Sequence, residues 1–115
     1  MKGLGASFGC AFKGIISVWR TERNMKIHLA AAVLALVLGG FLRLSWQEFL
    51  FVGMAIALVM MAEAFNTAIE TVVDLVSPEH NQLAGRAKDI AAGAVLLAAI
   101  FALVVGLVVF GRRLF

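Results

Sequence analysis

Three long apolar runs divide the sequence, and the charged residues gather between them and at their ends. The pattern predicts membrane-spanning segments over residues 27–44, 49–76 and 90–110. The hydrocarbon core of a bilayer is about 30 Å thick, and about 20 helical residues cross it. Helices are expected because open strands leave backbone groups unpaired in lipid, and no alternating strand pattern recurs along the chain.

Residues 1–26 are expected to form an amphipathic helix on the membrane surface. Apolar residues recur there at helical spacing, while basic residues occupy other faces. Pro78 disfavours helix at the residue before it, so the second span should end there and residues 77–89 should form a cytoplasmic loop. The expected fold is an all-α integral membrane protein, with an N-terminal surface helix and three transmembrane helices in one domain, 1–115.

Composition agrees with this class. The chain is 63% hydrophobic and 15% charged, which is outside the range of soluble domains. The net charge of +3 lies in residues that flank apolar runs, so contact with lipid headgroups is expected and nucleic acid binding is not. Cys10 is the single cysteine, which excludes an intrachain disulfide and a cysteine-based metal cluster. Residues 1–26 lack the apolar core of a signal peptide, so no cleavable leader is expected.

Basic residues predict the orientation of the spans, because they are enriched in cytoplasmic segments. With the N-terminus inside, seven basic residues face the cytoplasm and three face outward. The inner group is Lys2, Lys13, Arg20, Arg23, Lys26, Arg86 and Lys88, and the outer group is Arg43, Arg112 and Arg113. The N-terminus and the loop around Pro78 are therefore expected in the cytoplasm, and the C-terminus outside.

Four polar residues follow one face of the second predicted span. Glu63, Asn66, Glu70 and Asp74 are spaced by three, four and four positions, which places them within roughly 60° of one another around a helix. If Phe49 lies at one boundary of the hydrocarbon, Glu63 lies roughly 21 Å across it at 1.5 Å per residue. A charge at such depth costs about 2.5–3.5 kcal/mol on insertion scales, which makes it a candidate functional group. A polar contact between helices is the alternative.

These residues, with others at the same boundary, suit phosphoryl transfer. The carboxylates of Glu22 and Glu70 suit Mg²⁺, which binds one or two carboxylates together with phosphate oxygens. Lys88 can neutralise phosphate charge, and Glu63 can accept a proton from an alcohol. No phosphate-binding GxxxxGK[ST] loop and no protein-kinase motif occurs in the chain. From the residues alone, lipid phosphorylation and ion or proton translocation both remain open.

Two segments carry a resemblance to a known family. Residues 63–74 (EAFNTAIETVVD) and 87–96 (AKDIAAGAVL) resemble the prokaryotic diacylglycerol kinase / undecaprenol kinase family, and the similarity extends over nearly the whole chain. The resemblance implies a homotrimer of three-span subunits in the bacterial inner membrane. It also implies ATP and Mg²⁺, and transfer of the γ-phosphate to a lipid alcohol.

The resemblance also assigns roles to individual residues. Glu63 matches the catalytic base, and Glu22 and Glu70 match the metal-binding carboxylates, which need not meet within one chain because the sites form between subunits. The active-site lining would include Lys13, Asn66 and Asp74. The ATP-binding residues implied are Cys10, Glu22, Glu70, Glu79, His80, Asn81, Lys88 and Asp89.

The segment after Glu22 bears on the lipid substrate. Residues 23–28 (RNMKIH) resemble the Gram-positive branch, whose members phosphorylate undecaprenol, so undecaprenol is the expected acceptor and diacylglycerol the alternative. A small proton-coupled transporter subunit that uses Glu63 is a more remote alternative. His28, at the start of the first span, is expected to be an interfacial hydrogen-bonding group.

Overall fold

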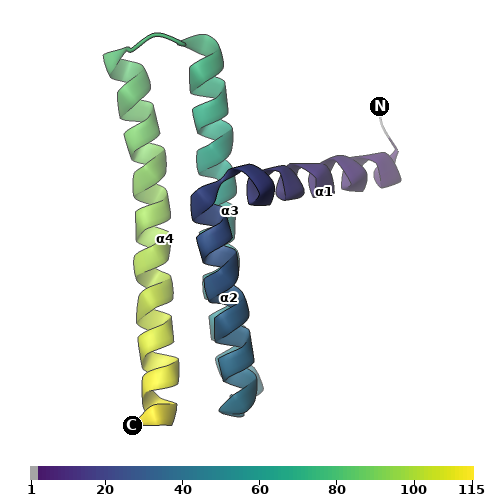
Figure 1. Cartoon of the computed structure of the whole chain (residues 1–115), viewed down its shortest axis with the longest axis vertical. Helices are drawn as coiled ribbons and strands as arrows, with labels where there is room; N and C mark the ends of the chain where they lie inside the picture. The colour runs from purple at the N-terminus through teal and green to yellow at the C-terminus, as the bar shows by residue number, and fades with distance from the viewer. Residues whose placement is uncertain (1–2) are drawn as a thin grey trace.

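Four α-helices make up the computed structural model of the chain, which describes residues 3–115. They are α1 (Leu4–Thr21), α2 (Arg23–Phe41), α3 (Trp46–Val76) and α4 (Gln82–Leu114). α2, α3 and α4 lie side by side with alternating direction, and α1 projects sideways from them (Figure 1). Residues 1 and 2 of the expected surface helix, including Lys2 of the inner basic group, lie outside the described residues.

Three of the helices, α2, α3 and α4, are long and apolar enough to cross a membrane. This agrees with the three spans that the apolar runs predict. α3 has 31 residues and α4 has 33, so they are roughly 46 and 50 Å long at 1.5 Å per residue. Both exceed the hydrocarbon thickness, and both continue past the α1–α2 junction toward the loop that joins them (Figure 1).

The turn between α2 and α3 is built by local hydrogen bonds. Ser45 is the N-cap of α3, as its position before the apolar run predicts. Its hydroxyl accepts from the Glu48 N–H at 3.2 Å, and the Glu48 carboxylate accepts from the Ser45 N–H at 2.9 Å. The preceding Arg43 adopts a left-handed conformation with φ of 54°. This reciprocal pair satisfies two backbone donors that the first turn of α3 would otherwise leave open.

The close approach of α2 to α3 depends on a glycine. A Cβ atom at Gly39 would lie 2.9 Å from Cε1 of Phe49 and 3.0 Å from Cδ1 of Leu44. The same atom at Gly40 would meet nothing within 4 Å. Gly39 therefore allows the contact that the Gly39–Gly40 pair suggests, and Gly40 faces away from it.

Helix boundaries differ from the predicted segments at three places. The predicted surface helix 1–26 breaks at Glu22, whose backbone is extended, and the charged residues after it already belong to α2. α2 ends at Phe41, inside the predicted span 27–44. α4 begins at Gln82, so the loop covers only residues 77–81 and not 77–89. The physical reason is that hydropathy marks contact with lipid, whereas a helix continues into polar sequence when its end is capped.

Asn81 provides that cap for α4. Its side-chain oxygen accepts hydrogen bonds from the N–H groups of Leu83 at 2.8 Å and Ala84 at 3.4 Å. The helix can therefore begin at Gln82, eight residues before the apolar run from Ile90. As a result Lys88 and Asp89 lie on a rigid helix and not on a loop.

Candidate active site

One face of α3 changes from apolar to polar along its length. Its buried residues are Val52, Ala55, Val59 and Glu63, spaced by three, four and four positions. The next positions of the same row are Asn66 and Glu70, which are half-buried, and the exposed Asp74. The packing face of the helix thus leads directly into the polar residues that the sequence singled out.

Glu63 is the one buried charged residue among residues 3–115, with 2% of its surface exposed. His28 of α2 lies beside it, with 3.2 Å between the imidazole Nε2 and Oε1 of the carboxylate. The ring N–H does not point along a hydrogen bond, so Oε1 is buried without a hydrogen-bond donor. An uncompensated buried carboxylate is costly, which makes Glu63 a site where function outweighs stability.

Asn66 and Glu70 form the next turn of this polar row. The Asn66 amide Nδ2 donates to Oε1 of Glu70 at 3.4 Å, while Oδ1 of Asn66 is buried without a donor. Two acceptor oxygens, on Glu63 and Asn66, therefore face the interior less than one helical turn apart without hydrogen-bond partners from the described chain. Such a pair suits a bound water, whose two O–H groups can donate one hydrogen bond to each oxygen.

Farther along α3, an ion pair joins this helix to α4. The Lys88 Nζ lies 2.6 Å from Oδ1 of Asp74. Both side chains remain accessible, so the ammonium can also contact a soluble ligand. Beside them is a hollow of about 140 Å³ at the α3–α4 connection. The predicted site residues around this hollow are Asp74, Glu79, His80, Asn81 and Lys88.

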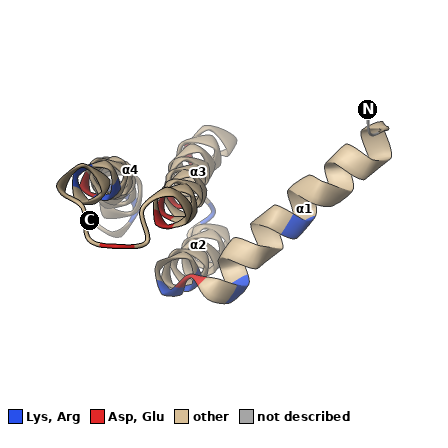
Figure 2. Ribbon diagram, turned by 90° about the horizontal axis from the view of Figure 1, so that it is seen from above, with Lys and Arg blue, Asp and Glu red and all other residues tan. Residues whose placement is uncertain are grey.

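Asp89 faces a different hollow. This second space, about 460 Å³, is lined by residues of the first turns of α4, including Arg86, and by His80. His80 borders both hollows and so connects them. The predicted nucleotide residues of the loop and of α4 are therefore gathered at one end of the molecule, where acidic segments lie on α3 and in the loop (Figure 2).

The N-terminal site residues lie apart from this group. Cys10 and Lys13 are exposed on α1, which extends away from the other helices (Figure 2). Glu22 occupies the break between α1 and α2. Within residues 3–115 there is no group of three or more histidine, cysteine or acidic side chains that could hold a metal ion. Glu22 and Glu70 nevertheless supply the hard oxygen ligands that suit Mg²⁺, which takes one or two carboxylates and completes its shell with phosphates and waters.

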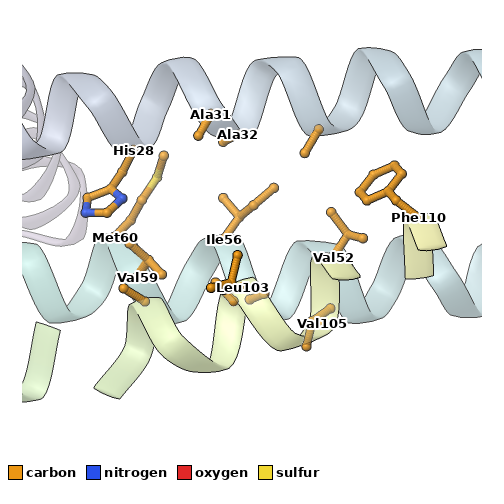
Figure 3. Close-up of a pocket in the computed structure, with 15 residues that line it drawn as sticks. His28, Ala31, Ala32, Val52, Ile56, Val59, Met60, Leu103, Val105 and Phe110 are labelled. Atoms are coloured by element: carbon orange, nitrogen blue, oxygen red, sulfur yellow. The ribbon is translucent and has the colours of Figure 1, made fainter. Parts of the chain in front are cut away.

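An apolar cavity lies on the other side of His28. It encloses about 280 Å³ between α2, α3 and α4 and is lined mainly by alanine and aliphatic side chains (Figure 3). His28 is the one lining residue with a polar side chain. Its imidazole thus borders the apolar cavity and also contacts the Glu63 carboxylate.

The pairing of His28 with Glu63 was not predicted from the sequence. A signal was available, because His28 is the second residue of the first apolar run and Glu63 lies deep in the second, antiparallel run. At 1.5 Å per residue both positions lie in the half of the hydrocarbon where the first run begins and the second run ends. Depth alone does not tell which faces of the two helices meet, so the contact required the packed structure.

Several known proteins are similar to this chain over most of its length. The model of the prokaryotic diacylglycerol kinase family matches residues 9–110. The undecaprenol kinase of Bacillus subtilis (strain 168) is 42% identical over 108 residues, which cover 94% of this chain and 88% of that protein. A diacylglycerol kinase of Synechocystis sp. is 43% identical over 87% of this chain and 58% of its own length. The diacylglycerol kinase of Escherichia coli (strain K12) is 35% identical over 84% and 79%.

The family match covers almost the entire chain. The matched residues include all of α3 and therefore its polar face. The resemblance drawn from residues 63–74 and 87–96 is confirmed. This chain belongs to the prokaryotic diacylglycerol kinase family.

Proposed function

We propose that this protein is an ATP- and Mg²⁺-dependent lipid kinase that transfers the γ-phosphate of ATP to undecaprenol, forming undecaprenyl phosphate. The observation that carries the proposal is the buried Glu63 carboxylate, with an apolar cavity on one side and a charged, accessible end of α3 and α4 on the other. A lipid hydroxyl and a soluble nucleotide can meet only where such regions adjoin. The identity to an undecaprenol kinase over 94% of the chain supports the choice of acceptor.

In the proposed reaction, Glu63 accepts the proton of the lipid hydroxyl as its oxygen attacks the γ-phosphorus. Lys88, beside Asp74, offers its ammonium to the phosphates at the accessible end. Glu22 and Glu70 would hold Mg²⁺, and the bound ion would offset the negative charge of the phosphates. The remaining proposed site residues surround the nucleotide and the lipid headgroup. They are Cys10 and Lys13 of α1, Asn66 and Asp74 of α3, Glu79, His80 and Asn81 of the loop, and Asp89 of α4.

The proposed setting is the bacterial inner membrane, with α1 lying amphipathically on its cytoplasmic surface. The N-terminus and the active site would face the cytoplasm, and the C-terminus would lie outside. The excess of basic residues on the α1 and loop side supports this orientation. A homotrimer is proposed because Glu22 lies on a different element from the polar face, so that neighbouring chains can complete each site.

Phosphorylation of diacylglycerol is the second candidate. Relatives from Escherichia coli and Synechocystis are diacylglycerol kinases by name. Undecaprenol remains the first candidate, because the identity to the undecaprenol kinase of Bacillus subtilis extends over 94% of this chain.

The test uses purified protein in mixed micelles with labelled ATP, Mg²⁺ and either undecaprenol or diacylglycerol. We expect labelled undecaprenyl phosphate, with a kcat/KM higher than that for diacylglycerol. Faster labelling of diacylglycerol would favour the second candidate. If neither lipid is labelled, the kinase proposal fails, and proton flux in liposomes without ATP would instead support the remote transporter alternative.

A further inference from the structure

The contact between His28 and Glu63 has no role in the chemistry described above. Nε2 of His28 lies 3.2 Å from Oε1 of Glu63, and no other ion pair involves either side chain among residues 3–115. A base must be held within about 3 Å of the proton that it removes, and a displacement of about 1 Å can cost a factor of 10² in rate. Glu63 is a long side chain whose carboxylate requires such support.

The helix packing gives His28 a defined position. Met25 and Ala32, three positions before it and four after it, are both buried, so this face of α2 packs against the bundle. His28 shares the face and its ring reaches toward α3 from it (Figure 3). The imidazole is thus anchored on a helix other than the one that carries the carboxylate.

We propose that His28 is a positioning residue for this reaction: it holds one oxygen of the Glu63 carboxylate and so aims the other at the lipid hydroxyl. The proposal rests on the proposed role of Glu63 as the base. His28 also borders the apolar cavity as its one polar lining residue, so it stands where a lipid chain would end and its hydroxyl would begin. Its effect is expected on the chemical step and not on nucleotide binding.

His28→Leu removes the polar ring and keeps a side chain of similar size. We expect kcat to fall by about 10- to 100-fold, with the KM for ATP unchanged within about twofold. His28→Gln keeps an amide donor at a similar reach and should recover several-fold of the loss. Gln47→Leu is the control, because it removes an exposed polar side chain in the first turn of α3, far from Glu63, and should leave turnover unchanged.

A double-mutant cycle separates positioning from a purely structural contact. Glu63→Asp withdraws the carboxylate by one methylene and already breaks the His28 contact, so adding His28→Leu to it should lower kcat by less than about threefold. If His28→Leu lowers kcat equally in both backgrounds, or leaves wild-type kcat unchanged, the positioning role is wrong while the kinase activity stands. If wild-type protein phosphorylates no lipid alcohol, it is the proposed function that has failed. Should His28→Leu not fold, the same comparison is made with His28→Ala, which also removes the polar ring.

Discussion

Glu63 is the residue on which the proposed function depends most. It continues a row of buried apolar residues, yet it is charged, and its Oε1 atom has no hydrogen-bond donor from the described chain. Natural proteins keep such a group only where another requirement outweighs stability. We propose that this requirement is removal of a proton from the hydroxyl of the lipid acceptor.

Glu63→Gln tests this requirement, because glutamine has nearly the same shape and cannot accept the proton. We expect turnover to fall by about 10²–10⁴-fold, the range that general acid–base catalysis contributes. Thermal stability should be unchanged or higher, since a buried charge is removed. Turnover is measured with labelled ATP, and unfolding is followed by circular dichroism. Wild-type turnover in this variant would contradict the assignment of the base.

Lys88→Met separates the observed contact of the ammonium with Asp74 from its proposed contact with a phosphate of ATP. The pair with Asp74 is accessible and should add little to stability, about 0–1 kcal/mol. Loss of a phosphate contact should raise the KM for ATP by roughly tenfold, or about 1.4 kcal/mol. Steady-state kinetics across ATP concentrations measure the effect. Arg112→Met, at the opposite end of α4, is the control and should leave the KM unchanged; an equal effect in both variants would point to general charge loss.

The helices are positioned by a few local devices. The capping box at Ser45 and Glu48 starts α3, and Arg113 pairs with Glu48, so the far end of α4 is tied to the start of α3. At the other end, the Asp74–Lys88 pair joins the same two helices. Ion pairs therefore join α3 to α4 near both ends of these helices. They align the polar face of α3 with the first turns of α4.

Gly39 tests the packing of α2 against α3. Gly39→Ala places a Cβ atom within 2.9 Å of Phe49, so that ring must move. We expect a loss of about 1–3 kcal/mol in the free energy of unfolding. Gly40→Ala is the matched control, because its Cβ meets nothing within 4 Å and alanine favours the helix. Both are compared by thermal unfolding in the same detergent, and equal midpoints would show that the contact adapts.

The single chain leaves its proposed site distributed over separate parts. The polar face and Lys88 lie together on α3 and α4, whereas Glu22 lies at the α1–α2 break and Cys10 lies on the projecting α1. Many large apolar side chains also remain exposed, as lipid contact or association with further copies requires. The proposed homotrimer, with each site completed by a neighbouring subunit, would account for both features.

Mixing two inactive variants tests whether subunits share a site. Glu22→Gln and Glu70→Gln should each be nearly inactive alone. If each site takes Glu22 and Glu70 from different chains, co-folding the two at equal amounts should restore about a quarter of the sites in a symmetric assembly. Turnover of the mixture measures the restoration, and its mass in mild detergent measures the assembly. A mixture that stays inactive would place both residues of a site in one chain.

Much of this protein followed from sequence alone. Apolar runs long enough to cross a bilayer leave helices as the available structure, so three spans, the cap at Ser45 and the row from Glu63 to Asp74 could be predicted. The family could be identified as well, because residues 63–74 and 87–96 resemble its sequences. These features depend on local periodicity, which a sequence records directly.

Other features were decided by packing. The start of α4 at Gln82 depended on the Asn81 cap, and the His28–Glu63 contact depended on which faces of α2 and α3 meet. The polar row on α3 continues the face whose earlier residues, Val52, Ala55 and Val59, are buried against the other helices. Periodicity alone did not reveal that this face points inward. Contacts between helices arise from the rotation and separation of whole elements, and residues far apart in the chain determine these together.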